Sequence, residues 1–127
     1  KYADIDNRHF AILKRCLPGP YTFILNASRD IPKIMLENRR EIGIRIPVSE
    51  FISALIDMIG EPLIVSTAVN EEGVSFNDPD EDSPSWLGYV DLLVDGGYVP
   101  AELTTIIRLN SDEYEVVREG KGPADIF

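Results

Sequence analysis

The fold class is decided by three consecutive segments: EIGIRIP (residues 41–47), SEFISALIDMIG (49–60) and PLIVSTAVNEEG (62–73). In the first segment, isoleucines alternate with glycine, arginine and proline, which is the period of a strand with one apolar face. In the second, a serine precedes apolar residues at helical spacing, and Gly60 stands where a left-handed helix cap is expected. The third opens with an apolar run, residues 62–67, that predicts a short buried strand.

Helix and strand signals also flank this region on both sides. Phe10, Leu13 and Leu17 have the spacing of one helix face, and Asp4 and Asp6 before them are candidate caps. This mixture predicts an α+β fold, a twisted mixed or antiparallel sheet with helices packed on it, and residues 1–127 are expected to form a single domain. The further predicted elements are helices over residues 7–16 and 30–38, a helical turn over 83–86, and strands over 21–28, 90–94, 104–109 and 113–120.

Composition limits the class of protein and the chemistry. With 127 residues and 44% hydrophobic content, the chain is long enough for one ordinary core, and it has no run of about 18 apolar residues that would span a bilayer. A single cysteine, Cys16, and a single histidine, His9, provide no disulfide, metal cluster or nucleophilic triad, so no catalytic nucleophile and no metal ligand is predicted. The polar start lacks the apolar core of a signal peptide, and a cytoplasmic protein without a membrane partner is expected.

The net charge of −10 is unevenly distributed along the chain. Residues 1–45 hold nine Lys and Arg against five Asp and Glu, whereas residues 46–107 hold twelve acidic residues and no Lys or Arg. Because a polyphosphate needs cationic or backbone N–H partners, it would be met by Arg45, the rest of the N-terminal third, Arg108 or Arg118.

Several residues carry signals that the pattern alone leaves open. Arg45 lies between isoleucines on a predicted strand, and it needs either solvent or an anion opposite it. Thr67 ends a predicted strand shortly before Asn70, which is typical of turns and also of ligand sites at a sheet edge. The pair Thr104 and Thr105 has the ordinary composition of a strand. The acidic run 78–82 lacks the spacing of a calcium loop and favours a solvated loop.

The order of these motifs resembles the YrdC-domain family, the threonylcarbamoyl-AMP synthases, over nearly the whole chain. Within that family the sequence is most similar to the YciO branch, because of a Gly-Gly-Tyr segment at 96–98, a Thr-Thr pair where others have Ser-Thr, and REGKG before a final phenylalanine. The resemblance implies the YrdC/RibB-like architecture. The motifs that carry it are PGPYTFIL (18–25), IGIRIP (42–47), PLIVST (62–67) with Asn70 and Gly73, VDLLVDGG (90–97), TTII (104–107) and VVREG (116–120).

The resemblance also implies an activity. The family condenses threonine, bicarbonate and ATP into threonylcarbamoyl-AMP and pyrophosphate for tRNA modification, usually with Mg²⁺, and it depends on positioning and charge neutralisation rather than on a nucleophile. The parent protein is therefore expected to be a nucleotidyltransferase. Carried over residue by residue, the substrate-binding residues would be Arg45, Thr104 and Thr67, and the nucleotide-binding residues Asn70, Arg118 and Thr22.

Two departures from the family pattern concern motifs of the activity and not of the fold. The Ser-x-Asn motif of the family is Ala68-Val69-Asn70 here, and the Lys-x-Arg motif is absent. We therefore expect residues 1–127 to be the C-terminal two thirds or so of a domain that lacks its N-terminal part, and this chain alone to be inactive. The alternative is a double-stranded RNA-binding, YciO-like protein without the full synthase activity, in which RNA contacts the basic N-terminal third.

Overall fold

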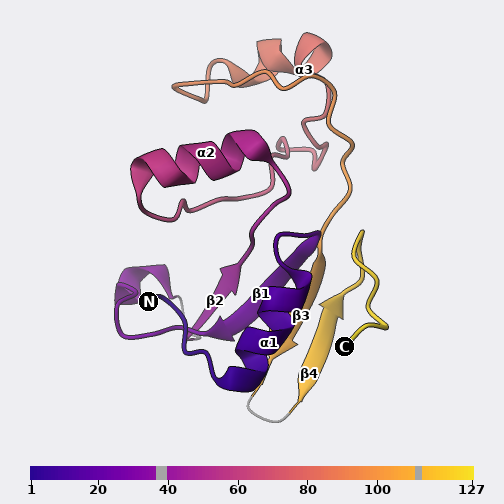
Figure 1. Ribbon diagram of the computed structural model, residues 1–127. Coiled ribbons are helices and arrows are strands. Elements are labelled where there is room, and N and C mark those ends of the chain that lie inside the picture. The colour runs from indigo at the N-terminus through magenta and orange to yellow at the C-terminus, as the bar shows by residue number, and fades with distance from the viewer. Residues whose placement is uncertain (37–39, 111–112) are drawn as a thin grey trace. The chain divides into compact units, whose positions relative to one another are not determined.

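The computed structural model describes residues 1–36, 40–110 and 113–127. The chain separates into two compact units, one formed by residues 1–58 with 103–127 and the other by residues 59–102, and each is considered by itself (Figure 1). Among the described residues, no helix is long and apolar enough to cross a membrane.

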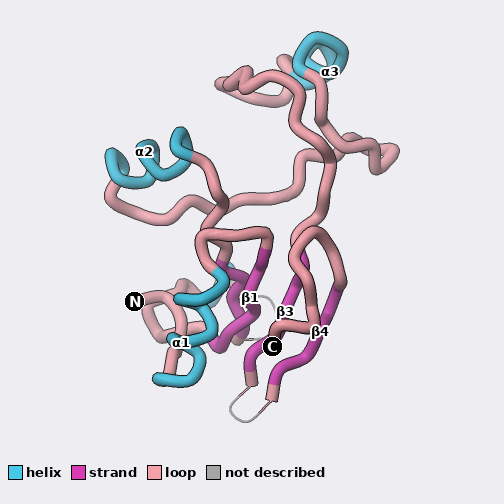
Figure 2. Tube along the Cα trace, turned by 45° about the vertical axis from the view of Figure 1, so that its right-hand side comes forward, coloured by secondary structure: helices cyan, strands magenta, loops and turns pink. Residues whose placement is uncertain are grey.

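A four-stranded mixed sheet forms the centre of the first unit, as Figures 1 and 2 show. Its order is β2-β1-β3-β4; β1 and β3 are parallel, and the two outer pairs are antiparallel. The predicted α+β class and the C-terminal hairpin are thus confirmed, although part of the expected hairpin turn lies outside the described residues. The strands are β1 (Tyr21–Asn26), β2 (Glu41–Ile44), β3 (Thr105–Leu109) and β4 (Tyr114–Arg118).

The two faces of this sheet differ in burial. One face of β1 and β3 is buried, and α1 (Asn7–Cys16) packs on it through Leu13 and Cys16. On the opposite face, the alternate residues of both strands are half-buried, except for exposed Asn26. The buried face consists of Tyr21, Phe23, Leu25, Thr105, Ile107 and Leu109.

The predicted first helix has the expected bounds, and of its predicted apolar face Leu13 and Leu17 lie at the core, whereas Phe10 does not. Asp6 caps it, because its carboxylate accepts a hydrogen bond from the His9 backbone N–H at 2.7 Å. Phe10 is 59% exposed, whereas His9, Leu13 and Cys16 are buried. His9 joins the buried face, and its Nε2 lies 3.0 Å from the carbonyl oxygen of Asn110, a contact that no local pattern predicts.

The helix predicted over residues 30–38 is a single 3₁₀ turn, Lys33–Met35, in its described part, and its end lies outside the described residues. Ile31 and Leu36 are buried with Ala27 in a second, smaller apolar cluster. A turn is sufficient to bring these side chains into the cluster.

The helix predicted after Ser49 is confirmed as α2 (Glu50–Ile59). The Ser49 hydroxyl accepts a hydrogen bond from the Ile52 N–H at 3.3 Å, and Gly60 follows with φ of +75°. No residue of α2 is buried, so this helix is specified by its caps and spacing rather than by a core contact.

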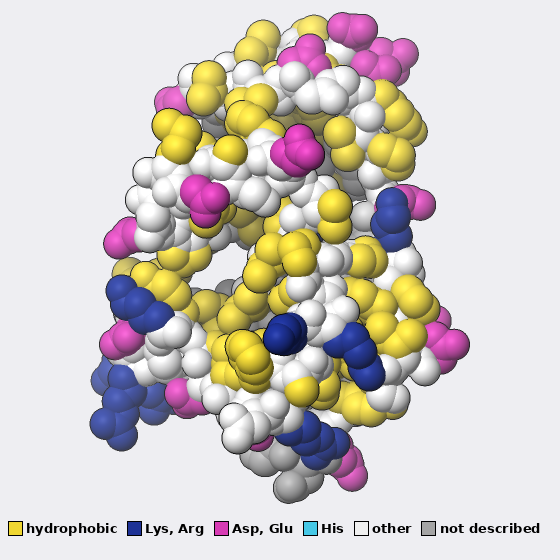
Figure 3. All heavy atoms as spheres, in the orientation of Figure 1, with side chains coloured by type: hydrophobic (Ala, Val, Ile, Leu, Met, Phe, Trp, Pro, Cys, Tyr) yellow, Lys and Arg dark blue, Asp and Glu magenta, His cyan; other side chains and the backbone are white. Residues whose placement is uncertain are grey.

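In the second unit, the strands predicted over residues 62–67 and 90–94 are wrong. Both segments are irregular, and Ile64 and Leu92 are 81% and 80% exposed. Figure 3 shows hydrophobic side chains at the surface of this unit. An apolar run becomes a strand only when another strand satisfies its backbone, and the isolated bridge within the described part of this unit, Val69↔Ser75, involves neither run.

The predicted helical turn at 83–86 is part of a longer helix, α3 (Pro79–Trp86). Asp78 caps it, and the proline at its first position needs no N–H partner. The Asp82 carboxylate accepts hydrogen bonds from the backbone N–H groups of Asn77 and Asp78 at 2.8 and 2.9 Å, which lowers its pKa. The acidic run 78–82 therefore builds this helix start.

Candidate functional site

Two threonine hydroxyls meet at one end of the central strands. Thr22 is the second residue of β1, and Thr104 directly precedes β3; the parallel register pairs Tyr21 with Thr105. The hydroxyl oxygens of Thr22 and Thr104 are 2.8 Å apart, and either can donate. Thr104 is buried and Thr22 is half-buried. Two of the predicted site residues, 82 positions apart in the sequence, are therefore in contact.

Arg118, the last residue of β4, joins this pair. Its Nε and Nη2 donate to the Thr104 carbonyl at 3.2 and 2.9 Å, and Nη2 lies 3.4 Å from the Thr104 hydroxyl. A guanidinium has five N–H donors, so donors remain for a ligand. The structure thus brings together three of the six predicted site residues.

A β-bulge aims Arg118 at the site. The antiparallel pairing of β3 and β4 shifts between Ile106 and Ile107, and the shift pairs Arg118 with Ile106. Without the extra residue, Val117 would take that position and Arg118 would fall on the buried face of the sheet. The bulge therefore places the guanidinium on the half-buried face that carries Thr22.

A buried hydroxyl that the sequence reasoning missed holds the chain after β4. Thr105 is 0% exposed; its Oγ1 accepts from the Gly120 N–H at 2.9 Å and donates to the Gly122 carbonyl. The Lys121 N–H also donates to the Leu103 carbonyl at 2.9 Å. A Cβ at Gly120 would overlap the backbone of residues 103–104, so this close approach requires glycine. The signal was present as a Thr-Thr pair and two later glycines, but strand propensity already explains the threonines.

Arg45 lies at the same end of the sheet. It follows Ile44, which pairs with Phe23, and it is exposed. A Cβ built on Gly43 would lie 3.6 Å from the Thr22 methyl group, so side chains at alternate positions of β2 face Thr22. Arg45 is the next residue on that face.

Thr67 and Asn70 belong to the other compact unit and are described within it. Both are exposed. The Asn70 side-chain oxygen accepts from the N–H groups of Glu72 and Val74 at 3.0 and 2.8 Å, which is the geometry of a side-chain-stabilised turn. Its NH₂ group remains as a donor, whereas the Thr67 carbonyl accepts from Ser66 Oγ at 3.3 Å.

Arg108 lies on the face of the sheet that carries Thr22, but glutamates neutralise it. Its Nη1 is 2.6 Å from Glu115 Oε2, and its Nε is 3.2 Å from Glu41 Oε1. The hydrogen bond to Glu115 contributes most to its raised pKa. This removes Arg108 from the cations expected to meet a polyphosphate.

Comparison with known proteins gives consistent results. The model of the Sua5/YciO/YrdC family, described as "Telomere recombination", matches residues 1–120. The "Uncharacterized protein YciO" of Escherichia coli (strain K12) is 39% identical over 129 residues, which cover 99% of this chain and 62% of that protein. A Bos taurus protein named "Threonylcarbamoyl-AMP synthase" is 30% identical over 110 residues, covering 87% of this chain and 40% of that protein.

Solved structures agree with the fold. The crystal structure of E. coli YciO superposes with a TM-score of 0.87 at 37% identity, covering 96% of this chain and 60% of that one. P. abyssi Sua5 complexed with L-threonine superposes with a TM-score of 0.82 at 23% identity, covering 94% and 36%, and supports the fold alone. The chain spans 62% of the length of the YciO protein that it matches.

Proposed function

The chain belongs to the Sua5/YciO/YrdC family, and from that premise we propose that its parent protein is a threonylcarbamoyl-AMP synthase-like nucleotidyltransferase. The observation that supports this proposal is the contact of Thr22, Thr104 and Arg118 on one face of the sheet. All three were assigned to substrate or nucleotide from the motifs alone. A hydroxyl pair beside a guanidinium suits a substrate that carries both hydrogen-bonding groups and negative charge.

The proposed reaction needs no protein nucleophile. Bicarbonate gives up its hydroxyl, and the threonine amine forms a bond to the resulting carbon dioxide. The proton that the amine loses combines with that hydroxide as water, which leaves a carbamate. A carbamate oxygen then forms a bond to the α-phosphorus of ATP, and the bond from that phosphorus to the pyrophosphate oxygen breaks. The products are pyrophosphate and threonylcarbamoyl-AMP, and the latter is the intermediate for tRNA modification. Binding, orientation and neutralisation of charge are what the protein must supply.

The proposal gives each of the six predicted site residues a role. The Thr104 hydroxyl hydrogen-bonds the substrate, and the Thr22 hydroxyl beside it hydrogen-bonds the nucleotide. The free donors of Arg118 neutralise phosphate charge of the nucleotide. Arg45 pairs with a carboxylate or a phosphate at the same edge. The NH₂ group of Asn70 is assigned to the nucleotide, and Thr67 to the substrate.

Magnesium normally accompanies ATP. In the part of the chain that the structure describes, no three His, Cys, Asp or Glu side chains gather closely enough to hold a metal ion. Mg²⁺ is commonly held by substrate phosphates and water with only one or two carboxylates. We therefore assign it to the triphosphate and give no residue of this chain a role as its ligand.

A second candidate function is a YciO-like protein that keeps the fold without the full synthase activity. Two observations favour it: YciO is more similar to this chain than the Bos taurus synthase is, at 39% against 30% identity, and Ala68 replaces the serine of the family motif. In that case the hydroxyl and guanidinium groups would bind another ligand, with double-stranded RNA on the basic N-terminal third as the notable option.

One experiment separates the two candidates. The intact parent protein is incubated with ATP, Mg²⁺, threonine and bicarbonate, and threonylcarbamoyl-AMP is measured by mass spectrometry alongside pyrophosphate release. We expect product, a loss of about a hundredfold for Arg118→Met, and little change for the matched control Lys14→Met. A folded parent that makes no product and gains no thermal stability from ATP would exclude the synthase and leave the second candidate.

A further inference from the structure

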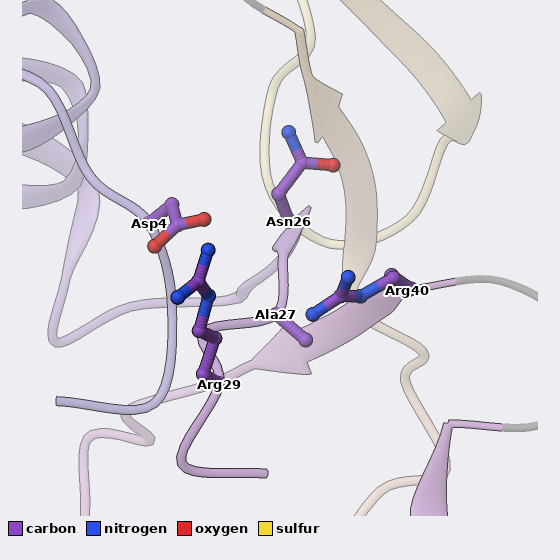
Figure 4. Close-up of a pocket in the computed structure, with 5 residues that line it drawn as sticks. All are labelled: Asp4, Asn26, Ala27, Arg29 and Arg40. Atoms are coloured by element: carbon purple, nitrogen blue, oxygen red, sulfur yellow. The ribbon is translucent and has the colours of Figure 1, made fainter. Parts of the chain in front are cut away.

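An open polar pocket lies on the surface at the opposite end of β1 from Thr22, and its polar and charged lining residues are exposed. It has no part in the proposed synthase. It measures about 340 Å³, and Figure 4 shows its five lining residues, Asp4, Asn26, Ala27, Arg29 and Arg40. They come from the N-terminal segment, from the end of β1 and the turn after it, and from the residue before β2. Two arginines eleven positions apart in the sequence thus line one cavity.

The backbone around this cavity is fixed by hydrogen bonds. The Asp4 N–H donates to the Asn26 carbonyl at 2.9 Å, and the Ala27 N–H donates to the Arg40 carbonyl at 2.8 Å. An isolated bridge pairs Ala3 with Ala27, which is 4% exposed and belongs to the smaller apolar cluster. The three segments that carry the charged groups are therefore tied to one another before any ligand arrives.

The charged side chains of the cavity have no partner within the protein as described. Among the described residues, neither Arg29 nor Arg40 makes a side-chain hydrogen bond or ion pair, and neither does the Asp4 carboxylate. In Figure 4, Arg29 extends toward Asp4, and Arg40 extends toward Ala27. Two guanidiniums and one carboxylate leave a local charge of about +1, in a chain whose net charge is −10.

This combination selects the chemistry of a ligand. Two guanidinium forks offer four N–H donors and two positive charges, and a phosphate monoester presents three terminal oxygens and up to two negative charges, against the two oxygens and single charge of a carboxylate. Asp4 would oppose a bare anion, but its carboxylate can accept a hydrogen bond from a hydroxyl on the same ligand. A small phosphorylated polyol satisfies all three groups.

We propose that Arg29 and Arg40, with Asp4 opposite them, form a binding site for the phosphate monoester of a small hydroxylated molecule. This site does not depend on the synthase proposal, because Thr22, Thr104 and Arg118 lie at the other end of the central strands. If the phosphate monoester does not bind, synthase activity can still be measured, and if synthase activity is absent, binding of the phosphate monoester can still be measured.

Ribose 5-phosphate titrated into the ¹⁵N-labelled intact parent protein is the probe, with ribose and inorganic phosphate alongside. We expect saturable shifts of the Ala27 amide and of the arginine side-chain Nε–H signals, none with ribose, and weaker binding of inorganic phosphate. Arg29→Met and Arg40→Met should each weaken binding roughly tenfold, and the lysine replacements less. Asp4→Asn should tighten inorganic phosphate.

The control Lys14→Met removes one exposed cation of α1, which does not line the cavity, and should leave the affinity unchanged. An equal loss in Lys14→Met and Arg29→Met would mean general surface attraction and would overturn the site. So would shifts that never saturate. Arginine-dependent binding of a short RNA duplex, without binding of ribose 5-phosphate, would replace the proposed ligand with nucleic acid.

Discussion

Replacing Thr105 by valine tests whether its hydroxyl holds the segment after β4. Valine has almost the same shape, so the change removes two hydrogen bonds at a side chain that is 0% exposed and leaves little cavity. Gly122 is buried, and its carbonyl would lose its hydroxyl partner at a cost of about 1–3 kcal/mol. Gly120 is exposed, so its N–H can turn to water and the second bond contributes only about 0.5–1.5 kcal/mol.

The expected loss is therefore about 1.5–4.5 kcal/mol in the free energy of unfolding. Urea denaturation followed by circular dichroism measures it, with an unchanged m-value required to attribute the shift to stability. Thr105→Ser is the matched control, because it keeps the hydroxyl and loses one methyl group, at about 1 kcal/mol. If Thr105→Ser were as unstable as Thr105→Val, the buried methyl group and not the hydroxyl would be responsible, and the reasoning would fail.

Three other predictions concern local geometry. Gly120→Ala should destabilise the chain by about 1–3 kcal/mol in the same urea assay, because its Cβ would overlap fixed backbone, whereas Gly88→Ala, with nothing within 4 Å, should be close to neutral. Gly60→Ala should cost about 1–2 kcal/mol and reduce the helical circular dichroism signal, since φ is +75° at that position. The lowered pKa of Asp82 stabilises the fold above the ordinary carboxyl range, and this contribution is lost as pH falls through the folded-state pKa. Asp82→Asn should abolish that pH-dependent part, and stability profiles that coincide from neutral pH to pH 3 would contradict it.

Elements with local signals could be predicted from the sequence, and elements that depend on a partner could not. The helices at Asn7–Cys16 and Glu50–Ile59 carry their own caps, and the strands of the sheet alternate clearly. The apolar runs at 62–67 and 90–94 carry equally strong hydrophobic signals, yet strand formation requires a neighbour that satisfies the backbone. Hydrophobicity in the sequence does not show whether such a neighbouring strand exists.

The candidate site was predictable for a different reason. Thr22, Thr104 and Arg118 were selected through family motifs, and their contact could not be derived from spacing because 82 residues separate the two threonines. The bulge that aims Arg118 depends on pairing with β3. Arg29 and Arg40 were counted only as part of a basic third, because nothing local indicates that the ends of two strands bring them to one cavity.

The two arginines on the Thr22 face of the sheet differ in what a phosphate would have to displace. Arg108 already contacts two glutamates, so an anion could reach it only by breaking ion pairs and by approaching carboxylates. Arg118 is held by the carbonyl of Thr104, which fixes the guanidinium without neutralising it. Its full positive charge stays available, and its position is set before a ligand binds, so little ordering entropy remains to oppose binding. Arg108 is thus a cation that stabilises the sheet, whereas Arg118, which the bulge in β4 positions, is free to act on an anion.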